Sequence, residues 1–91
     1  MNKERRKALS DAVGLLSDAS AKVESAKEII EMCRDDEQDA YDNLPESMQD
    51  GERGSAMQDN IDGLDEVYYE IDSVSETLSE QIGAIQEVID R

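Results

Sequence analysis

The chain of 91 residues is 37% hydrophobic and holds three aromatic residues, which is too little material for a thick core. Its 24 acidic and 9 basic residues give a formal net charge of −15, and it contains no histidine. The charge disfavours direct binding to nucleic acid, and the missing imidazole excludes histidine-based catalysis and the common zinc-ligand sets. We therefore expect one thin domain over residues 1–91, with no enzymatic activity, cofactor or metal.

The cysteine content and the hydropathy pattern indicate in which cellular compartment the protein is located. Cys33 is the only cysteine, so the chain can form no internal disulfide. The basic segment Lys3–Lys7 is similar to the start of a signal peptide, but Asp11 and Asp18 interrupt the apolar run that would have to follow. No apolar stretch is long enough to cross a membrane. These features predict a cytoplasmic protein without membrane contact.

A seven-residue repeat from Leu9 to Ala40 predicts a first helix over about residues 3–41. Large apolar residues recur at one position, and small residues, here called the small series, follow three positions later. Alternating large and small side chains predict a closely packed partner helix, with Cys33 buried as a packing residue. Glu37 interrupts the large residues, so looser packing is expected toward the turn. The large residues are Leu9, Leu16, Val23 and Ile30, and the small series is Ala12, Ala19, Ala26, Cys33 and Ala40.

Residues 42–52 are predicted to form the turn, and they contain the only proline. Pro45 forces the residue before it out of helical geometry, so the first helix should end near residue 41. Ser47, followed by an acid three residues later, resembles a helix start. The second helix therefore begins there or near Arg53.

Two smaller features suggest how the helices pack. Leu44 and Met48 are expected to close the turn end of the core. Gly14, Gly63 and Gly83 lie inside the predicted helices, where each costs about 1 kcal/mol relative to alanine. A close helix crossing is the expected reason for their presence.

The second half repeats the heptad pattern over about residues 53–90, with Met57, Leu64, Ile71, Leu78 and Ile85 at one position. Further apolar residues flank this stripe, which is wider than a single partner helix requires. The predicted fold is all-α: an antiparallel two-helix hairpin, coiled-coil-like, that dimerises into a four-helix bundle. In the alternative, the extra residues only thicken the contact within one hairpin. The predicted self-association residues are Leu64, Val67, Ile71, Leu78, Ile82 and Ile85.

Negative charge is concentrated in the second part of the chain. Residues 1–34 hold seven basic and six acidic side chains, a net of +1, whereas residues 35–91 hold two basic and eighteen acidic ones, a net of −16. On the second helix the acids lie opposite the apolar stripe and form a ridge that is predicted to bind a basic protein surface. The residues of this acidic ridge are Asp59, Asp62, Asp65, Glu66, Asp72, Glu76 and Glu80.

The density of the acidic ridge suggests mimicry of DNA. Its carboxylates recur about every 5 Å along a helix, and the phosphates of one DNA strand recur about every 3.4 Å. In the alternative, the acids only prevent aggregation. The basic segment Lys3–Lys7 is expected to contact the acidic end of a neighbouring hairpin.

A motif surrounds the turn: Asp-Glu-Gln at residues 36–38, Tyr-Asp-Asn-Leu-Pro-Glu-Ser-Met-Gln at 41–49 and Glu-Arg-Gly at 52–54. It resembles a motif in short acidic helical proteins of bacteriophages and prophages, over the central third of the chain. The resemblance implies a phage or mobile-element origin and a place in the bacterial host cell. Small acidic phage proteins include inhibitors of restriction and of CRISPR systems, so an anti-CRISPR or related role is implied by analogy. In the alternative, the motif is a structural turn.

The hairpin is also similar in length to the small secreted proteins of the WXG100 family, but it has no tryptophan for their turn signature. Two alternative functions are therefore expected. The first is an acidic decoy or DNA-mimic inhibitor of a host defence or DNA-binding protein. The second is a structural or assembly module that uses its apolar stripe and has no target related to nucleic acid.

Overall fold

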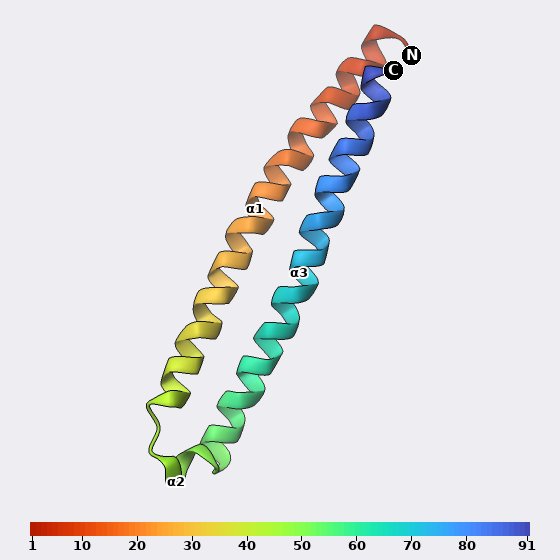
Figure 1. Ribbon diagram of the computed structural model, residues 1–91. Coiled ribbons are helices and arrows are strands. Elements are labelled where there is room, and N and C mark those ends of the chain that lie inside the picture. The colour runs from red at the N-terminus through yellow and green to blue at the C-terminus, as the bar shows by residue number, and fades with distance from the viewer.

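The computed structural model describes every residue from Met1 to Arg91. Two long helices, α1 (Lys3–Asp42) and α3 (Glu52–Asp90), lie side by side and antiparallel (Figure 1). A one-turn helix, α2 (Glu46–Gln49), lies between them at the turn. Both chain ends meet at the opposite end of the rod, which we call the open end. The predicted all-helical hairpin is confirmed.

The rod is long and thin. Its Cα atoms span 69 × 14 × 13 Å and have a radius of gyration of 20.3 Å, against about 12 Å for a compact chain of this length. Helices of 40 and 39 residues account for the length at about 1.5 Å per residue. Ile61, with 3% of its surface exposed, is the only buried hydrophobic residue. The two helices therefore share a single contact line and enclose almost no core.

Both ends of α1 have a local cause. The side chain of Asn2 caps the helix by accepting a hydrogen bond from the backbone N–H of Arg5 at 2.9 Å. At the other end, the N–H of Asn43 still donates to the carbonyl of Asp39 at 3.0 Å, and Pro45 then stops the helix. The last turn of α1 contains no basic residue, so no cation offsets the partial negative charge of the helix terminus.

Pro45 also begins α2, because its carbonyl accepts the backbone N–H groups of Met48 and Gln49 at 2.8 and 3.1 Å. The side-chain amide of Gln49 donates to the carbonyl of Tyr41 at 3.2 Å and ties α2 to the end of α1. Gly54 is buried in the first turn of α3, where an added Cβ would overlap the carbonyl of Gln49. The turn therefore requires glycine at this position.

Two packing predictions are wrong. Nothing lies within 4 Å of the position that a Cβ would take at Gly14, Gly63 or Gly83, so no close helix crossing requires these glycines. At the turn end, Leu44 is half-buried, but Met48 is 41% exposed and does not close the core.

The contact between α1 and α3, here called the seam, differs from the predicted heptad arrangement in one respect. The large apolar residues lie along it as predicted, but the second seam position comes four residues after each large residue instead of three. All residues at this second position are buried or half-buried. On α1 they are Val13, Ser20, Lys27, Arg34 and Tyr41, and on α3 they are Gly54, Ile61, Tyr68, Ser75, Ile82 and Ile89.

The small series of α1 consequently lies beside the seam, and Cys33 is exposed, so its predicted burial is wrong. The cause lies on α3. There the second seam position carries large apolar residues such as Ile61 and Ile82, whereas the position one residue earlier includes Asn60 and Gln81. Turning the larger apolar residues toward α1 removes more apolar surface from water.

Candidate interaction surfaces

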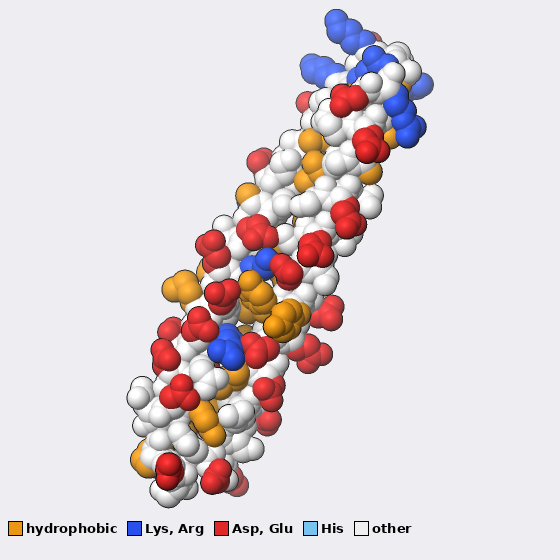
Figure 2. Space-filling view, viewed as in Figure 1, with side chains coloured by type: hydrophobic (Ala, Val, Ile, Leu, Met, Phe, Trp, Pro, Cys, Tyr) orange, Lys and Arg blue, Asp and Glu red, His pale blue; other side chains and the backbone are white.

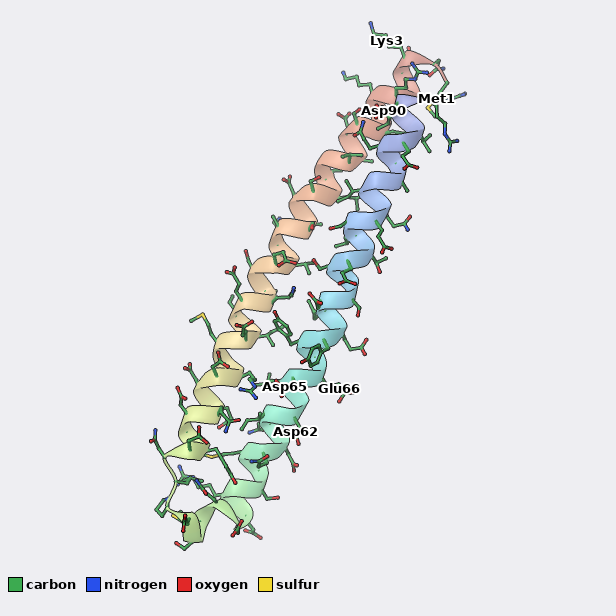
Figure 3. All side chains as sticks on the ribbon, in the orientation of Figure 1. Met1, Lys3, Asp62, Asp65, Glu66 and Asp90 are labelled. Carbon is green, nitrogen blue, oxygen red and sulfur yellow. The ribbon has the colours of Figure 1, made fainter.

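The acidic ridge predicted on α3 divides into two groups. Five of its seven members are exposed, whereas Asp65 and Asp72 are half-buried at the edge of the seam. Figure 3 labels Asp62, Asp65 and Glu66, which lie on neighbouring turns of α3. We call the exposed acids on the outer side of α3 the outer ridge. It consists of Asp59, Asp62, Glu66, Glu70, Glu76 and Glu80, continued by Glu87 and Asp90.

The outer ridge is sparser than the sequence suggested. Its eight carboxylates extend from residue 59 to residue 90, roughly 46 Å of helix, so they recur about every 7 Å. Tyr69 and Ser73 lie among these acids near the middle of the ridge, beside the exposed Glu70, and Tyr69 is 70% exposed there. The outer ridge therefore carries an exposed aromatic ring near its middle.

Asp72 belongs to a polar cluster in the seam. The Lys27 ammonium lies 2.5 Å from the Asp72 carboxylate and 3.4 Å from that of Glu24. The Ser75 hydroxyl donates to the same Glu24 carboxylate, and the Lys27 ammonium also lies 5.3 Å from the ring centroid of Tyr68. Only 8% of Lys27 is exposed, so this cluster places a charged residue inside the hairpin.

The cluster shifts the pKa of its members in the directions that keep Lys27 and Glu24 charged and Tyr68 neutral. Hydrogen bonding to Asp72 raises the pKa of Lys27. The Ser75 hydroxyl, supported by Lys27, lowers the pKa of the Glu24 carboxylate below its ordinary value. The interaction of the Tyr68 hydroxyl with the Glu31 carboxylate raises the pKa of Tyr68.

A second polar contact lies seven residues away. The Arg34 guanidinium donates to Asp65 at 2.8 Å and approaches Asp35 at 3.5 Å. A shallow hollow of about 310 Å³ opens beside it, lined mostly by charged and aromatic side chains. The hollow is partly open to solvent, and two of its six lining residues are tyrosines. Figure 2 shows this side of the rod, with basic side chains lying among acidic ones along its middle.

Asp65 and Asp72, which were predicted to lie on a partner surface, instead pair with Arg34 and Lys27, whose role was not predicted. A signal for the pairing is present in the sequence. Lys27 and Arg34 are seven residues apart, as are Asp65 and Asp72. In an antiparallel pair of heptad helices, equal spacings of this kind bring both pairs together.

The opposite side of the seam carries the small series and the equivalent positions of α3. Viewed from one end of the rod, the chain winds clockwise around one helix and anticlockwise around the other, because the two helices are antiparallel. Residues at the same heptad position on the two helices therefore lie on the same side of the seam. A second hollow, which both Glu37 of α1 and Val67 of α3 line, marks this side. We call it the uncovered face. It consists of Ala12, Ala19, Ala26, Cys33 and Ala40 on α1 and Asn60, Val67, Val74, Gln81 and Val88 on α3.

None of the ten residues of the uncovered face is charged, although Glu37 and Asp59 line the hollow on the same side. Seven of the ten are exposed, among them Val67 at 46% and Val74 at 48%. Leu15 and Ile29, with the exposed Lys22 between them, lie along its α1 edge and are 72% and 61% exposed. An uncharged strip along so acidic a rod is unusual for a surface that faces only water.

The residues predicted to mediate self-association are mostly occupied within the hairpin. Val67 is exposed on the uncovered face, whereas the other five lie half-buried along the seam. These five are Leu64, Ile71, Leu78, Ile82 and Ile85. None of them is fully buried, so the apolar stripe is only partly covered by α1.

No helix of the structure combines the length and the apolar character needed to span a membrane. No group of three or more Cys, Asp or Glu side chains is arranged to hold a metal ion. Comparison with protein families, curated proteins and solved structures found no match to this chain.

Proposed function

We propose that this protein is a non-enzymatic, phage-type interaction protein that acts as an acidic decoy, a DNA mimic that occupies a basic surface of a host defence or DNA-binding protein. The observation that supports this proposal is the outer ridge. Its acids project from a single continuous helix, and none of its side chains forms an ion pair within the hairpin. These carboxylates are free to meet cations of a partner.

The rod shape favours such a role. A helix of 39 residues presents its carboxylates at fixed spacings, so little conformational entropy is lost when a partner binds. Exposed carboxylates also attract a basic partner over a distance of about 8 Å at physiological ionic strength. The association should therefore be rapid and should weaken steeply with salt.

Charge reversal tests the proposal. The triple variant Asp62→Lys, Glu66→Lys and Glu76→Lys should lose capture of DNA-binding proteins from a bacterial lysate at low salt, with its helicity retained. A DNA duplex of about 30 base pairs should displace the captured proteins from the unchanged protein, since both compete for one basic surface.

A control matched in charge uses Asp11→Lys, Asp18→Lys and Asp39→Lys, which are exposed acids of α1. This variant should retain capture. If both triple variants bind equally, or if the DNA duplex displaces nothing, the outer ridge is not a decoy.

The uncovered face favours a second candidate, a structural or assembly module. Two hairpins that join through this face would form a four-helix bundle in which the half-buried large residues of both helices are covered. Sedimentation of the purified protein tests this association. A dimer that captures no partner would favour the assembly module, and a monomer at all accessible concentrations would exclude it.

A further inference from the structure

We infer that the uncovered face binds a second copy of this chain in the antiparallel orientation, with the turn end of each hairpin beside the open end of the other. α1 then packs against α1 of the other copy, and α3 against its α3. The inference rests on the proposed association of two hairpins, and it is independent of the decoy function.

The amount of exposed surface indicates that a partner covers the rod. The solvent-accessible surface is 6653 Å² for a mass of 10.1 kDa, whereas a compact monomer of this mass exposes about 5,300 Å². Covering an excess of about 1,400 Å² on each copy would give an interface of about 2,700 Å² in total, within the range of permanent homodimers.

The dimensions of the face agree with this estimate. A strip along the whole rod is 69 Å long and about as wide as the two helices together, 14 Å between the outermost Cα atoms. Its flat area is roughly 970 Å², which already exceeds the share of one partner in a standard interface. Interdigitating side chains bury more than the flat area.

The heptad positions indicate which surface is covered. In a four-helix bundle each helix packs against two neighbours. Its core is formed by the large residues and by the residues three positions after them. In the isolated hairpin these large residues stay half-exposed, from Leu9 to Ile30 on α1 and from Leu64 to Ile85 on α3. A second copy on the uncovered face would cover both sets at once. The small series would allow the two α1 helices to approach closely.

The charge distribution decides the orientation. Residues 35–59, at the turn end, carry nine acidic side chains and one basic one, a net of −8. Residues 3–7 and 88–91, at the open end, carry five basic and two acidic ones, a net of +3. Figure 2 shows the basic side chains gathered at the end where the termini meet.

Two orientations allow a symmetric pair to join through one shared face. A parallel pair places the two turn ends, each with a net charge of −8, against each other. An antiparallel pair places each turn end beside the basic segment Lys3–Lys7 of the other copy. Like charges in contact oppose association, and opposite charges promote it. The antiparallel pair is therefore the favoured one.

A distance between spin labels at the turn distinguishes the orientations. The variant Cys33→Ala/Ser47→Cys carries one label in the exposed α2 helix. In the antiparallel dimer the two labels lie at opposite ends of a rod 69 Å long, and double electron–electron resonance should give about 60 Å. A parallel dimer should give about 20 Å.

The possible outcomes separate this inference from the association itself. A distance near 60 Å supports the antiparallel pair. A distance near 20 Å contradicts the orientation and leaves the association intact. No distance peak, with sedimentation as a monomer, contradicts both.

A pair of matched variants tests which face is used. Ile29→Glu places a carboxylate at the edge of the uncovered face and should raise the dimer dissociation constant at least about tenfold. Met32→Glu introduces the same charge one turn away on α1, at a residue that is 64% exposed on the side remote from α3. It should change the constant less than about twofold. Equal effects of the two variants would contradict the assigned face.

Discussion

Lys27 shows how a charged residue is accommodated in a molecule with so little core. Its ammonium contacts Asp72 and Glu24, and its methylene stem packs in the seam. A buried charge without partners would be very unfavourable, and these two carboxylates supply them. The chain contains acids in excess, so partners for a basic residue are available on both helices.

The Glu24 carboxylate gives the stability of the hairpin a defined pH dependence. Its pKa is lowered from the ordinary value of 4.5. Its contribution is therefore fully present above about pH 4.5, and it is lost as the pH falls through the lower pKa of the folded state. We expect Glu24→Gln to lower the stability against urea at pH 7, and the difference from the unchanged protein to shrink toward pH 3.

Glu28→Gln is the control for that measurement, because Glu28 is exposed and forms no ion pair. This variant removes a charge of the same sign outside the cluster. Its stability against urea at pH 7 should therefore differ much less from that of the unchanged protein. A Glu24→Gln difference that is equal at both pH values would contradict a role for the ionised carboxylate.

At the scale of elements, each long helix follows from its heptad pattern, whereas the turn depends on particular backbone contacts. α2 packs on the first turn of α3, and Gly54 allows this close approach. The glycines within α1 and α3 have no such role, because the space around them is open. The same residue type therefore has opposite effects on stability at different positions.

Alanine substitutions test this contrast. Gly14→Ala should stabilise the protein by about 1 kcal/mol, because alanine favours the helix and meets no neighbour. Gly54→Ala should destabilise it by about 1–3 kcal/mol, because its Cβ overlaps the Gln49 backbone. Thermal unfolding measures both, with shifts of about 4–8 °C per kcal/mol. Shifts of the same sign would contradict the turn geometry.

At the scale of the whole molecule, the acidic rod must withstand its own charge. Four ion pairs join its side chains, but the formal net charge is −15. Repulsion among the unpaired acids is therefore the dominant long-range electrostatic interaction. It acts along both helices and is strongest at the turn end.

Salt should consequently stabilise the hairpin. Raising NaCl from about 20 to 200 mM shortens the screening length to below about 10 Å and should raise the melting temperature by on the order of 5 °C. Circular dichroism at low protein concentration isolates this effect from association. A melting temperature that falls with salt would show that the ion pairs outweigh the repulsion.

The helices, the hairpin and the apolar stripe all follow from local patterns in the amino-acid sequence. Heptad spacing fixes which residues share one side of a helix, whatever the partner. Leu9, Leu16 and Ile71 therefore lie along the seam as their spacing indicated. The position of the turn followed in the same local way, from the effect of Pro45 on its neighbours.

The flank of the apolar stripe that lies in the contact between α1 and α3 depends instead on how the two helices pack. Residues three and four positions after a large residue both adjoin the stripe, so the spacing on one helix cannot select between them. The choice depends on both helices together: the apolar bulk of Ile61 on α3, and the carboxylates that receive Lys27 and Arg34 of α1. As a result of this packing, Cys33 is exposed, Asp65 and Asp72 lie at the seam instead of on the outer ridge, and no helix of the hairpin covers the uncovered face.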